Sequence, residues 1–271
     1  MLDQLLALAT TAKASAMLVF AHPDDETVAL GARLHRLQSP LLVHLTDGAP
    51  RNLEDSIAHG FRSLAEYRRQ REQELASAFQ LVGLDRARRV RLGIPDQEAS
   101  FHLQPMTRDV RRLLLRYRPK MVFTHPYEGG HPDHDACAFA VHRAVESLKA
   151  VGRQFTIIEA PFYHFGPDGM TTGCFLPHHD QQEIRCLPLS PEELRRKQDL
   201  LACFPSQHDI LQCFPTNQEI FRIAPQYDFH QPPHTPPVFY DQRPWGMTAI
   251  RFCDLAREAD VTDSEAVSAC H

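Results

Sequence analysis

Five short apolar runs alternate with segments of helical periodicity over the first 160 residues of this 271-residue chain. The predicted strands are residues 16–21, 41–45, 89–92, 121–124 and 155–158. The predicted helices between them are residues 26–37, 61–82, 107–117 and 135–150. Strands that alternate with helices form right-handed βαβ units around a mostly parallel sheet. We therefore expect an α/β fold, a Rossmann-like three-layer sandwich.

The composition changes near residue 160, because 13 of the 21 prolines lie at or after Pro161. Ser190-Pro191-Glu192-Glu193 is a capping box that predicts one helix ending near Ala202. The rest of this half predicts loops and edge strands, a Pro-rich C-terminal elaboration of the fold. We expect a single domain over residues 1–271, with a catalytic part over about 1–160, a substrate wall over about 161–256 and a weakly specified tail over 257–271.

Charge and hydropathy exclude several classes of function. A net charge of −5 argues against nucleic acid as a partner, and the absence of an 18-residue apolar stretch argues against a membrane span. Residues 1–9 lack a basic segment and predict a short amphipathic helix, not a signal peptide. The seven scattered cysteines are typical of reduced thiols. We expect a cytoplasmic protein whose oligomeric state, a homo-oligomer included, stays open.

The first predicted strand ends in an unusual group of ionisable residues, His22-Pro23-Asp24-Asp25. One of the two aspartates could simply cap the helix that follows. Capping does not explain two acids in succession directly after a histidine, and such groups are costly to bury at a strand end without a compensating cation. A divalent metal would compensate them. The acids would also repel phosphate, so a dinucleotide site is disfavoured.

The fourth predicted strand leads into a second segment of this kind, which contains His125, His131, Asp133 and His134. Asp133 could be the N-cap of the following helix. Since the carboxyl ends of parallel strands meet at one edge of a sheet, the two segments should lie together. They supply enough donors for a site of two histidines and one carboxylate, with one carboxylate left over as a base.

The two segments resemble those of a known family. Ala21-His22-Pro23-Asp24-Asp25-Glu26 with His131-Pro132-Asp133-His134 is similar to the motifs of the LmbE-like, PIG-L type zinc de-N-acetylases. The resemblance covers about the first 160 residues, and it extends to Thr46-Asp47-Gly48-Ala49, Arg71-x-x-Glu74-Leu75 and Leu92-Gly93-Ile94-Pro95-Asp96. The family includes deacetylases of mycothiol synthesis, of bacillithiol synthesis and of GlcNAc-phosphatidylinositol.

The resemblance implies roles for three groups of residues. The expected ligands of a Zn²⁺ ion, with Fe²⁺ as an alternative, are His22, Asp25 and His134. The expected catalytic residues are Asp24 as general base, His131 as oxyanion stabiliser or acid, and Asp133, which would orient the His131 imidazole. The residues expected to face substrate hydroxyls are Arg71 and Asp96.

The resulting expectation is a zinc-dependent amidohydrolase that removes an N-acetyl or other acyl group from an amino sugar or sugar conjugate. A non-haem Fe(II) oxygenase is an alternative, because His22-Pro23-Asp24 fits its usual His-x-Asp pattern, although the βα alternation argues against it. A non-catalytic sugar-binding protein on the same scaffold is another. We expect residues 227–245, with Tyr227, His234 and Trp245, to line the mouth above the metal.

Overall fold

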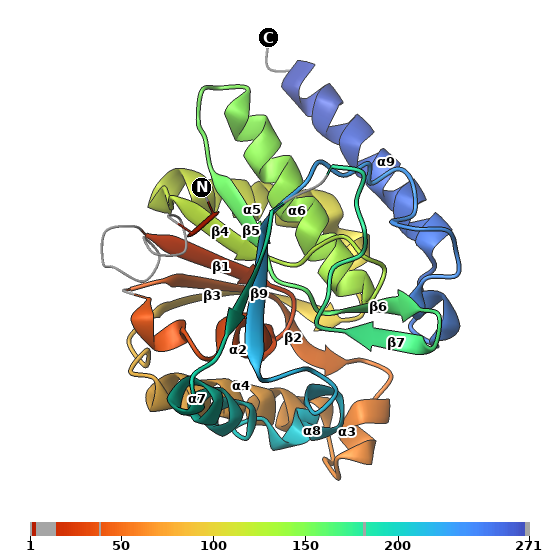
Figure 1. Cartoon of the computed structure of the whole chain (residues 1–271). Helices are drawn as coiled ribbons and strands as arrows, with labels where there is room; N and C mark the ends of the chain where they lie inside the picture. Colours follow the sequence, from red (N-terminus) through yellow and green to blue (C-terminus); the bar gives the residue numbers. More distant parts are fainter. Residues whose placement is uncertain (1, 4–14, 38, 181–182, 269–271) are drawn as a thin grey trace.

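The computed structural model describes residues 2–3, 15–37, 39–180 and 183–268, so most of the helix expected over residues 1–9 lies outside them. Seven strands form one sheet in the order β3-β2-β1-β4-β5-β9-β8 (Figure 1). The parallel strands are β1 (Ala16–Phe20), β2 (Leu41–Pro50), β3 (Arg88–Asp96), β4 (Met121–Thr124) and β5 (Thr156–Glu159). Antiparallel pairing then adds β9 (Gln218–Ile223) and β8 (Ile184–Pro188). The expected α/β fold with a mostly parallel sheet is confirmed.

Helices cover both faces of this sheet (Figure 1). One face carries α2 (Asp25–Leu30), α4 (Leu64–Leu81) and α7 (Pro191–Leu201). The other carries α5 (Leu103–Tyr117), α6 (Pro132–Lys149) and α9 (Ala249–Ser268). Two short helices, α3 (Glu54–Ala58) and α8 (His208–Leu211), and the hairpin of β6 (Tyr163–Gly166) and β7 (Gly169–Thr172) complete the fold, with 3₁₀ turns at Leu34–Arg36, Ala99–His102, Pro205–Gln207 and Phe239–Gln242.

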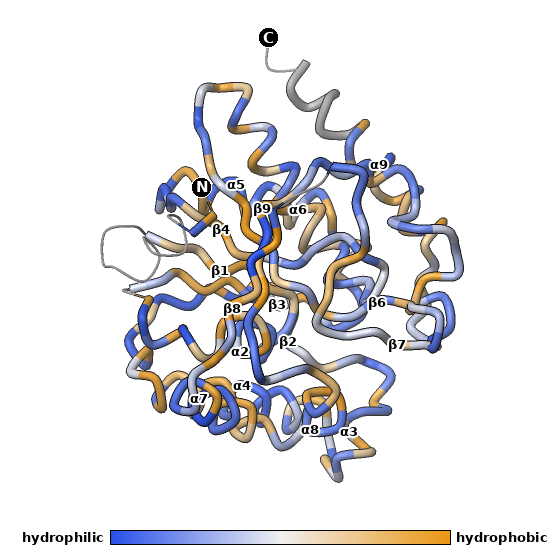
Figure 2. Tube along the Cα trace, in the orientation of Figure 1, coloured by the Kyte–Doolittle hydropathy of each residue, from blue (hydrophilic) through white to orange (hydrophobic). Residues whose placement is uncertain are grey.

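The inner strand β1 divides its side chains between two hydrophobic cores. Met17 and Val19 belong to the core under α5, α6 and α9, whereas Leu18 and Phe20 belong to the core under α2, α4 and α7. Successive residues of a strand point to opposite faces, so a strand that is buried on both faces is apolar throughout. The outer helices α4 and α5 alternate hydrophilic and hydrophobic residues along their length (Figure 2), as expected for helices with one buried face.

Two helices begin at other residues than expected, because their N-terminal capping contacts set the first residue. Ser63 accepts a hydrogen bond from the Glu66 N–H, so α4 begins at Leu64. The helix expected from residue 135 begins at Pro132, since proline suits the first helical position. Its N-cap is His131, whose side chain accepts from the Asp133 N–H, so the expectation that Asp133 is the N-cap was wrong.

The Pro-rich half contributes more regular structure than expected. The helix predicted by the Ser190 capping box is present as α7. The described part of the tail over residues 257–271 is helical, because α9 continues to Ser268. No helix within the described residues is both long and apolar enough to cross a membrane.

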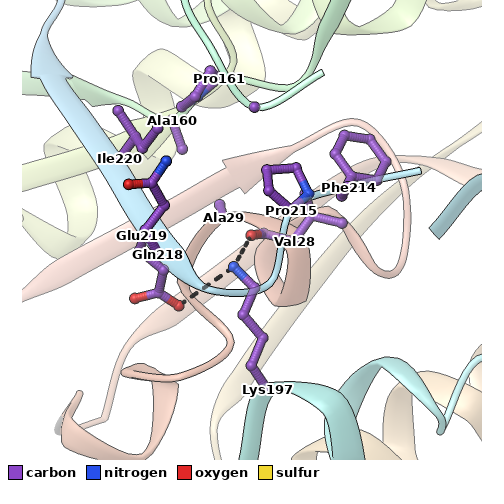
Figure 3. A pocket seen from close by; sticks show the side chains of 11 residues that line it. Val28, Ala29, Ala160, Pro161, Lys197, Phe214, Pro215, Gln218, Glu219 and Ile220 are labelled. Carbon is purple, nitrogen blue, oxygen red and sulfur yellow. Dashed lines mark hydrogen bonds and ion pairs between the residues drawn. The ribbon is translucent and has the colours of Figure 1, made fainter. Parts of the chain in front are cut away.

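A buried lysine ties α7 to the helix that follows β1 (Figure 3). The Lys197 ammonium donates to the Val28 carbonyl oxygen at 2.7 Å and lies 3.7 Å from the Glu219 carboxylate. Glu219 in turn accepts from the Ala32 N–H at 2.8 Å and from Arg33 at 2.6 Å. These bonds fix the C-terminal end of α2, whose other end carries Asp24 and Asp25.

Lys197→Met should therefore lower the free energy of unfolding by about 1–3 kcal/mol, because the buried acceptors of the ammonium lose their donor. Arg36→Ala is the matched control, since Arg36 pairs with Glu193 at 2.8 Å but is 41% exposed. Its effect should stay below about 1 kcal/mol. Urea unfolding measures both, and equal effects would contradict this role of Lys197.

Candidate active site

A cleft of about 630 Å³ opens at the carboxyl ends of the parallel strands. It lies where the strand order reverses between β1 and β4, which is where open α/β sheets bind ligands. The residues predicted from the two His/Asp segments, the long helix and the end of the third strand meet in its wall, namely His22, Asp24, Asp25, Arg71, Asp96, His131 and His134. Segments more than 100 residues apart in sequence thus form one site.

Three of these residues form a compact donor set. One nitrogen of His22, one nitrogen of His134 and one oxygen of Asp25 all lie within 4.8 Å of one another. The His134 Nε2 is 3.3 Å from the His22 Nδ1 and 3.5 Å from the Asp25 Oδ1. Their side chains are only 6–11% exposed. Two imidazoles and one carboxylate suit Zn²⁺, and they also suit Fe²⁺.

The hydrogen bonds of His22 fit a metal-binding role. Its Nε2 donates to the Asp96 Oδ1 at 3.1 Å, so Nδ1 is the nitrogen that faces His134 and Asp25. A carboxylate behind the distal nitrogen is the usual partner of a metal-bound histidine. Although burial opposes it, the neighbouring His22 lowers the pKa of Asp96. Asp96 was expected to face substrate; it lines the cleft and also orients His22.

Asp24 is held in a strained conformation beside this donor set. Its φ of 145° is sparsely populated by residues other than glycine, and such strain is concentrated at functional sites. Its Oδ2 accepts from the Arg71 Nη2 at 3.0 Å, and the Arg71 Nε donates to the Gly48 carbonyl oxygen at 3.3 Å. Gly48 has a φ of +64°, and a Cβ there would lie 2.9 Å from Arg71. The segment Thr46–Ala49, one of those that resemble the family, therefore helps to position Arg71.

Arg71 lines the cleft as expected, and its guanidinium also contacts two carboxylates of the protein. The Arg71 side chain is 2% exposed, and its guanidinium lies between Asp24 and Glu74. Glu74 is itself fixed by the Ser206 hydroxyl at 2.6 Å. Burial raises the pKa of Asp24 to about 7, and the Arg71 guanidinium opposes that rise. The main contact of Arg71 is thus with the expected general base.

His131 presents an N–H to the cleft. Burial lowers the pKa of His131 well below its usual value, so the ring is neutral at pH 7. Its Nδ1 accepts from the Asp133 backbone N–H at 3.1 Å, which places the ring proton on Nε2. The Asp133 carboxylate instead accepts from the N–H groups of Gln97 and Ala99 at 2.6 and 2.9 Å. The main chain of Asp133, not its carboxylate, therefore orients the imidazole.

Two other histidines near the strand ends differ in their surroundings. His125 stacks on the His134 ring at 3.9 Å and 13°, so it supports the orientation of a ligand residue. His44 lies in the core, where its Nε2 is 2.9 Å from a carboxylate oxygen of the buried Glu26. His44 is accordingly a structural residue.

The second half of the chain supplies the opposite wall of the cleft. Trp245 lines it as expected, with its ring 4.6 Å from the His131 ring. The expectation for Tyr227 and His234 was wrong, since neither is among the lining residues. Tyr227 is engaged behind the cleft, where its hydroxyl donates to Glu159 and accepts from Arg222. Buried ion pairs such as Glu159–Arg222 are stable only when further hydrogen bonds satisfy their polar atoms, and Tyr227 supplies such bonds.

Several lining residues were not predicted from the sequence. They come from β6 and from the segment around α8, and they include Tyr163, Gln207 and Phe214. Tyr163 follows β5, a parallel strand that ends at the same sheet edge as β1 and β4. A residue that follows the fifth predicted strand could therefore have been predicted to lie in the cleft wall.

Sequence comparison finds a known family that resembles the part of the chain with the two His/Asp segments. Residues 17–145 match the family model PIG-L, described as GlcNAc-PI de-N-acetylase. A probable N-acetyl-alpha-D-glucosaminyl L-malate deacetylase 2 of Bacillus subtilis (strain 168) is 29% identical over 156 residues. That match covers 55% of this chain and 68% of the relative.

Structure comparison finds the same fold in enzymes of more than one activity. The zinc-inhibited form of teicoplanin deacetylase Orf2 has a TM-score of 0.61 at 14% identity, over 79% of this chain and 99% of that one. The 4-carboxy-2-hydroxymuconate hydratase of Pseudomonas putida KT2440 has a TM-score of 0.51 at 16% identity, over 74% and 82%. At such identities the likeness concerns the fold. Residues 17–145, which contain both His/Asp segments, are thus similar to the PIG-L (LmbE-like) family.

Proposed function

We propose that this chain is a metal-dependent amidohydrolase that removes an N-acetyl or other acyl group from an amino sugar or a related small amide. The observation that carries the proposal is the meeting of a three-residue donor set with two further polar groups, Asp24 and His131, in one cleft. The relatives that are named as deacetylases support the same reaction.

The proposed division of labour follows from the hydrogen bonds. His22, Asp25 and His134 would hold the metal, proposed to be Zn²⁺. When bound, such an ion polarises the amide carbonyl and makes a water ligand acidic near pH 7. Asp24 takes the proton of the attacking water and passes it to the leaving nitrogen. His131 donates its Nε2–H to the developing oxyanion.

The fold and the site weigh against the rival functions. A non-haem Fe(II) oxygenase of the expected type needs a double-stranded β roll, whereas this sheet is mostly parallel. A sugar-binding protein has no need of a strained carboxylate at the position of Asp24. The hydratase with the same fold shows that fold alone does not select the reaction, so the reaction must be assayed.

The test is an assay of free amine and acetate on a panel of N-acetylated amino sugars and their glycosides, with and without oxygen. We expect equimolar amine and acetate from at least one sugar, at the same rate in both atmospheres. Turnover that requires oxygen would favour the oxygenase. Tight binding of a sugar without turnover would favour the binding protein.

Trp245 should influence which amide is accepted. Its ring lies over the cleft between His131 and Phe239, with ring centroids at 4.6 and 6.3 Å, so it can contact a substituent remote from the amide. Trp245→Ala should change the ratio of kcat/KM between two sugars of the panel by about tenfold, with metal content intact. Tyr227→Phe, which lies outside the cleft, is the control. An unchanged ratio in Trp245→Ala would assign specificity to other residues.

A further inference from the structure

The loop that presents His131 is held by a buried carboxylate of the helix that follows it. The Asp135 Oδ1 accepts from the backbone N–H groups of Glu128 and Gly129 at 3.2 and 3.1 Å. The Asp135 N–H in turn donates to the His131 carbonyl oxygen at 3.1 Å. Asp135 is 1% exposed, so water does not compete for these bonds. One residue therefore bonds to both ends of the loop over residues 128–131.

The other oxygen of the same carboxylate binds the second half of the chain. The Asp135 Oδ2 accepts from the hydroxyl of the buried Tyr240 at 3.1 Å. Tyr240 lies in the 3₁₀ turn Phe239–Gln242, shortly before Trp245 of the cleft wall. The Trp245 ring centroid is 4.6 Å from that of His131. The carboxylate thus connects the loop of His131 to the segment that carries Trp245.

The main chains of these two segments are also in close contact. The Phe239 N–H donates to the Gly129 carbonyl oxygen at 2.9 Å. Gly129 has a φ of +70°, and a Cβ there would lie 2.7 Å from the Val238 Cβ. Because protein interiors are close-packed, a displacement of one segment must displace the other.

We infer that Asp135 is a positioning residue, which acts on catalysis through His131 and on substrate choice through Trp245. This inference rests on the proposed amide hydrolysis. Asp135 is not among the described residues that line the cleft, so it does not touch the substrate. Its contribution is to hold the His131 Nε2–H where the acyl oxygen becomes negative. An oxyanion donor acts only over a narrow range of distances, so a small displacement of the loop lowers turnover.

The first test compares Asp135→Ala with Asp135→Asn in the full metal-loaded chain, using the best substrate of the amino-sugar panel. Alanine removes all three side-chain bonds, whereas the asparagine oxygen can still accept from the two loop N–H groups. We expect kcat to fall by about 10- to 100-fold in Asp135→Ala, with KM and metal content little changed. Asp135→Asn should restore most of this loss. An unchanged kcat in Asp135→Ala, or a rise in KM alone, would overturn the inference.

Arg143→Ala is the control for a loss of stability alone. Arg143 lies on the same helix as Asp135 and bonds the Asp260 carboxylate on α9 at 2.7 and 2.9 Å. Both alanine variants should lower Tm, but Arg143→Ala should leave kcat unchanged. An equal fall of kcat in the two variants would show that general destabilisation, and not the position of His131, explains the effect.

A double-mutant cycle tests whether Asp135 acts through His131. In the His131→Ala background, Asp135→Ala should lower kcat by less than about threefold, because the group that it positions is already absent. A loss there as large as in the wild-type background would overturn the inference.

Tyr240→Phe tests the connection to Trp245, and it applies even if Asp135→Ala does not fold. This variant removes only the bond to the Asp135 Oδ2. It should shift the ratio of kcat/KM between two sugars of the panel in the same direction as Trp245→Ala, and an unchanged ratio would overturn the inference. These outcomes leave the proposed function intact as long as the wild-type protein releases amine. Absence of amine release by the wild-type protein from every sugar would overturn both.

Discussion

The Asp24→Asn variant is expected to keep its bound metal and to lose about 10²–10⁴-fold in turnover, the usual scale for loss of a general base. Asparagine preserves the shape of the side chain and an oxygen for Arg71, which donates to the Asp24 Oδ2 at 3.0 Å. It cannot take the proton of the attacking water. Metal analysis and steady-state kinetics on the same sample measure both properties.

Asp25→Asn is the matched control, because it makes the same chemical change at the next residue. Asp25 lies in the donor set, 3.5 Å from the His134 Nε2. This variant should bind metal weakly, and its activity should recover in part when metal is added in excess. If both variants lose metal equally, or if Asp24→Asn loses more, the division of labour between the two aspartates is wrong.

His131→Ala is expected to lower kcat by about 10²–10³-fold, the range seen when one oxyanion donor is removed. The ring is neutral and its Nδ1 accepts from the Asp133 N–H, so the Nε2–H is the group that is lost. KM should change much less, because the bond strengthens as charge develops.

His131→Gln provides the comparison, since its amide restores an N–H donor on a side chain of similar reach. We expect kcat between those of the alanine variant and the wild type. A KM effect alone in His131→Ala would make the residue a substrate anchor. Equal kcat values for the alanine and glutamine variants would show that donation is not what His131 contributes.

The donor set could be predicted from sequence because parallel strands share an edge. His22 follows β1 and His134 opens the helix after β4, and these two strands are adjacent in the sheet. Apolar runs located both strands, so the distance of 112 residues between the histidines was no obstacle.

The supporting contacts could not be predicted in the same way, because they depend on which side chains meet in three dimensions. The sequence does not show that Arg71 bonds Asp24, or that Asp96 lies behind His22. Residues 227–245 illustrate the same limit, since Trp245 faces the cleft whereas Tyr227 faces Glu159 and Arg222. Proline-rich segments lack the periodicity that reveals a buried face, so nothing in their pattern distinguished the two.

The central claim is that amide hydrolysis takes place at the metal site of His22, Asp25 and His134. Its most direct test is to strip the protein with a chelator, restore Zn²⁺ in steps, and measure amine release from the best N-acetylated sugar at each step. We predict activity that rises in proportion to bound metal and levels off at about one equivalent per chain. The His134→Ala variant should neither bind the metal tightly nor release amine. Full activity in the stripped protein, or full metal occupancy and turnover in His134→Ala, would contradict the account.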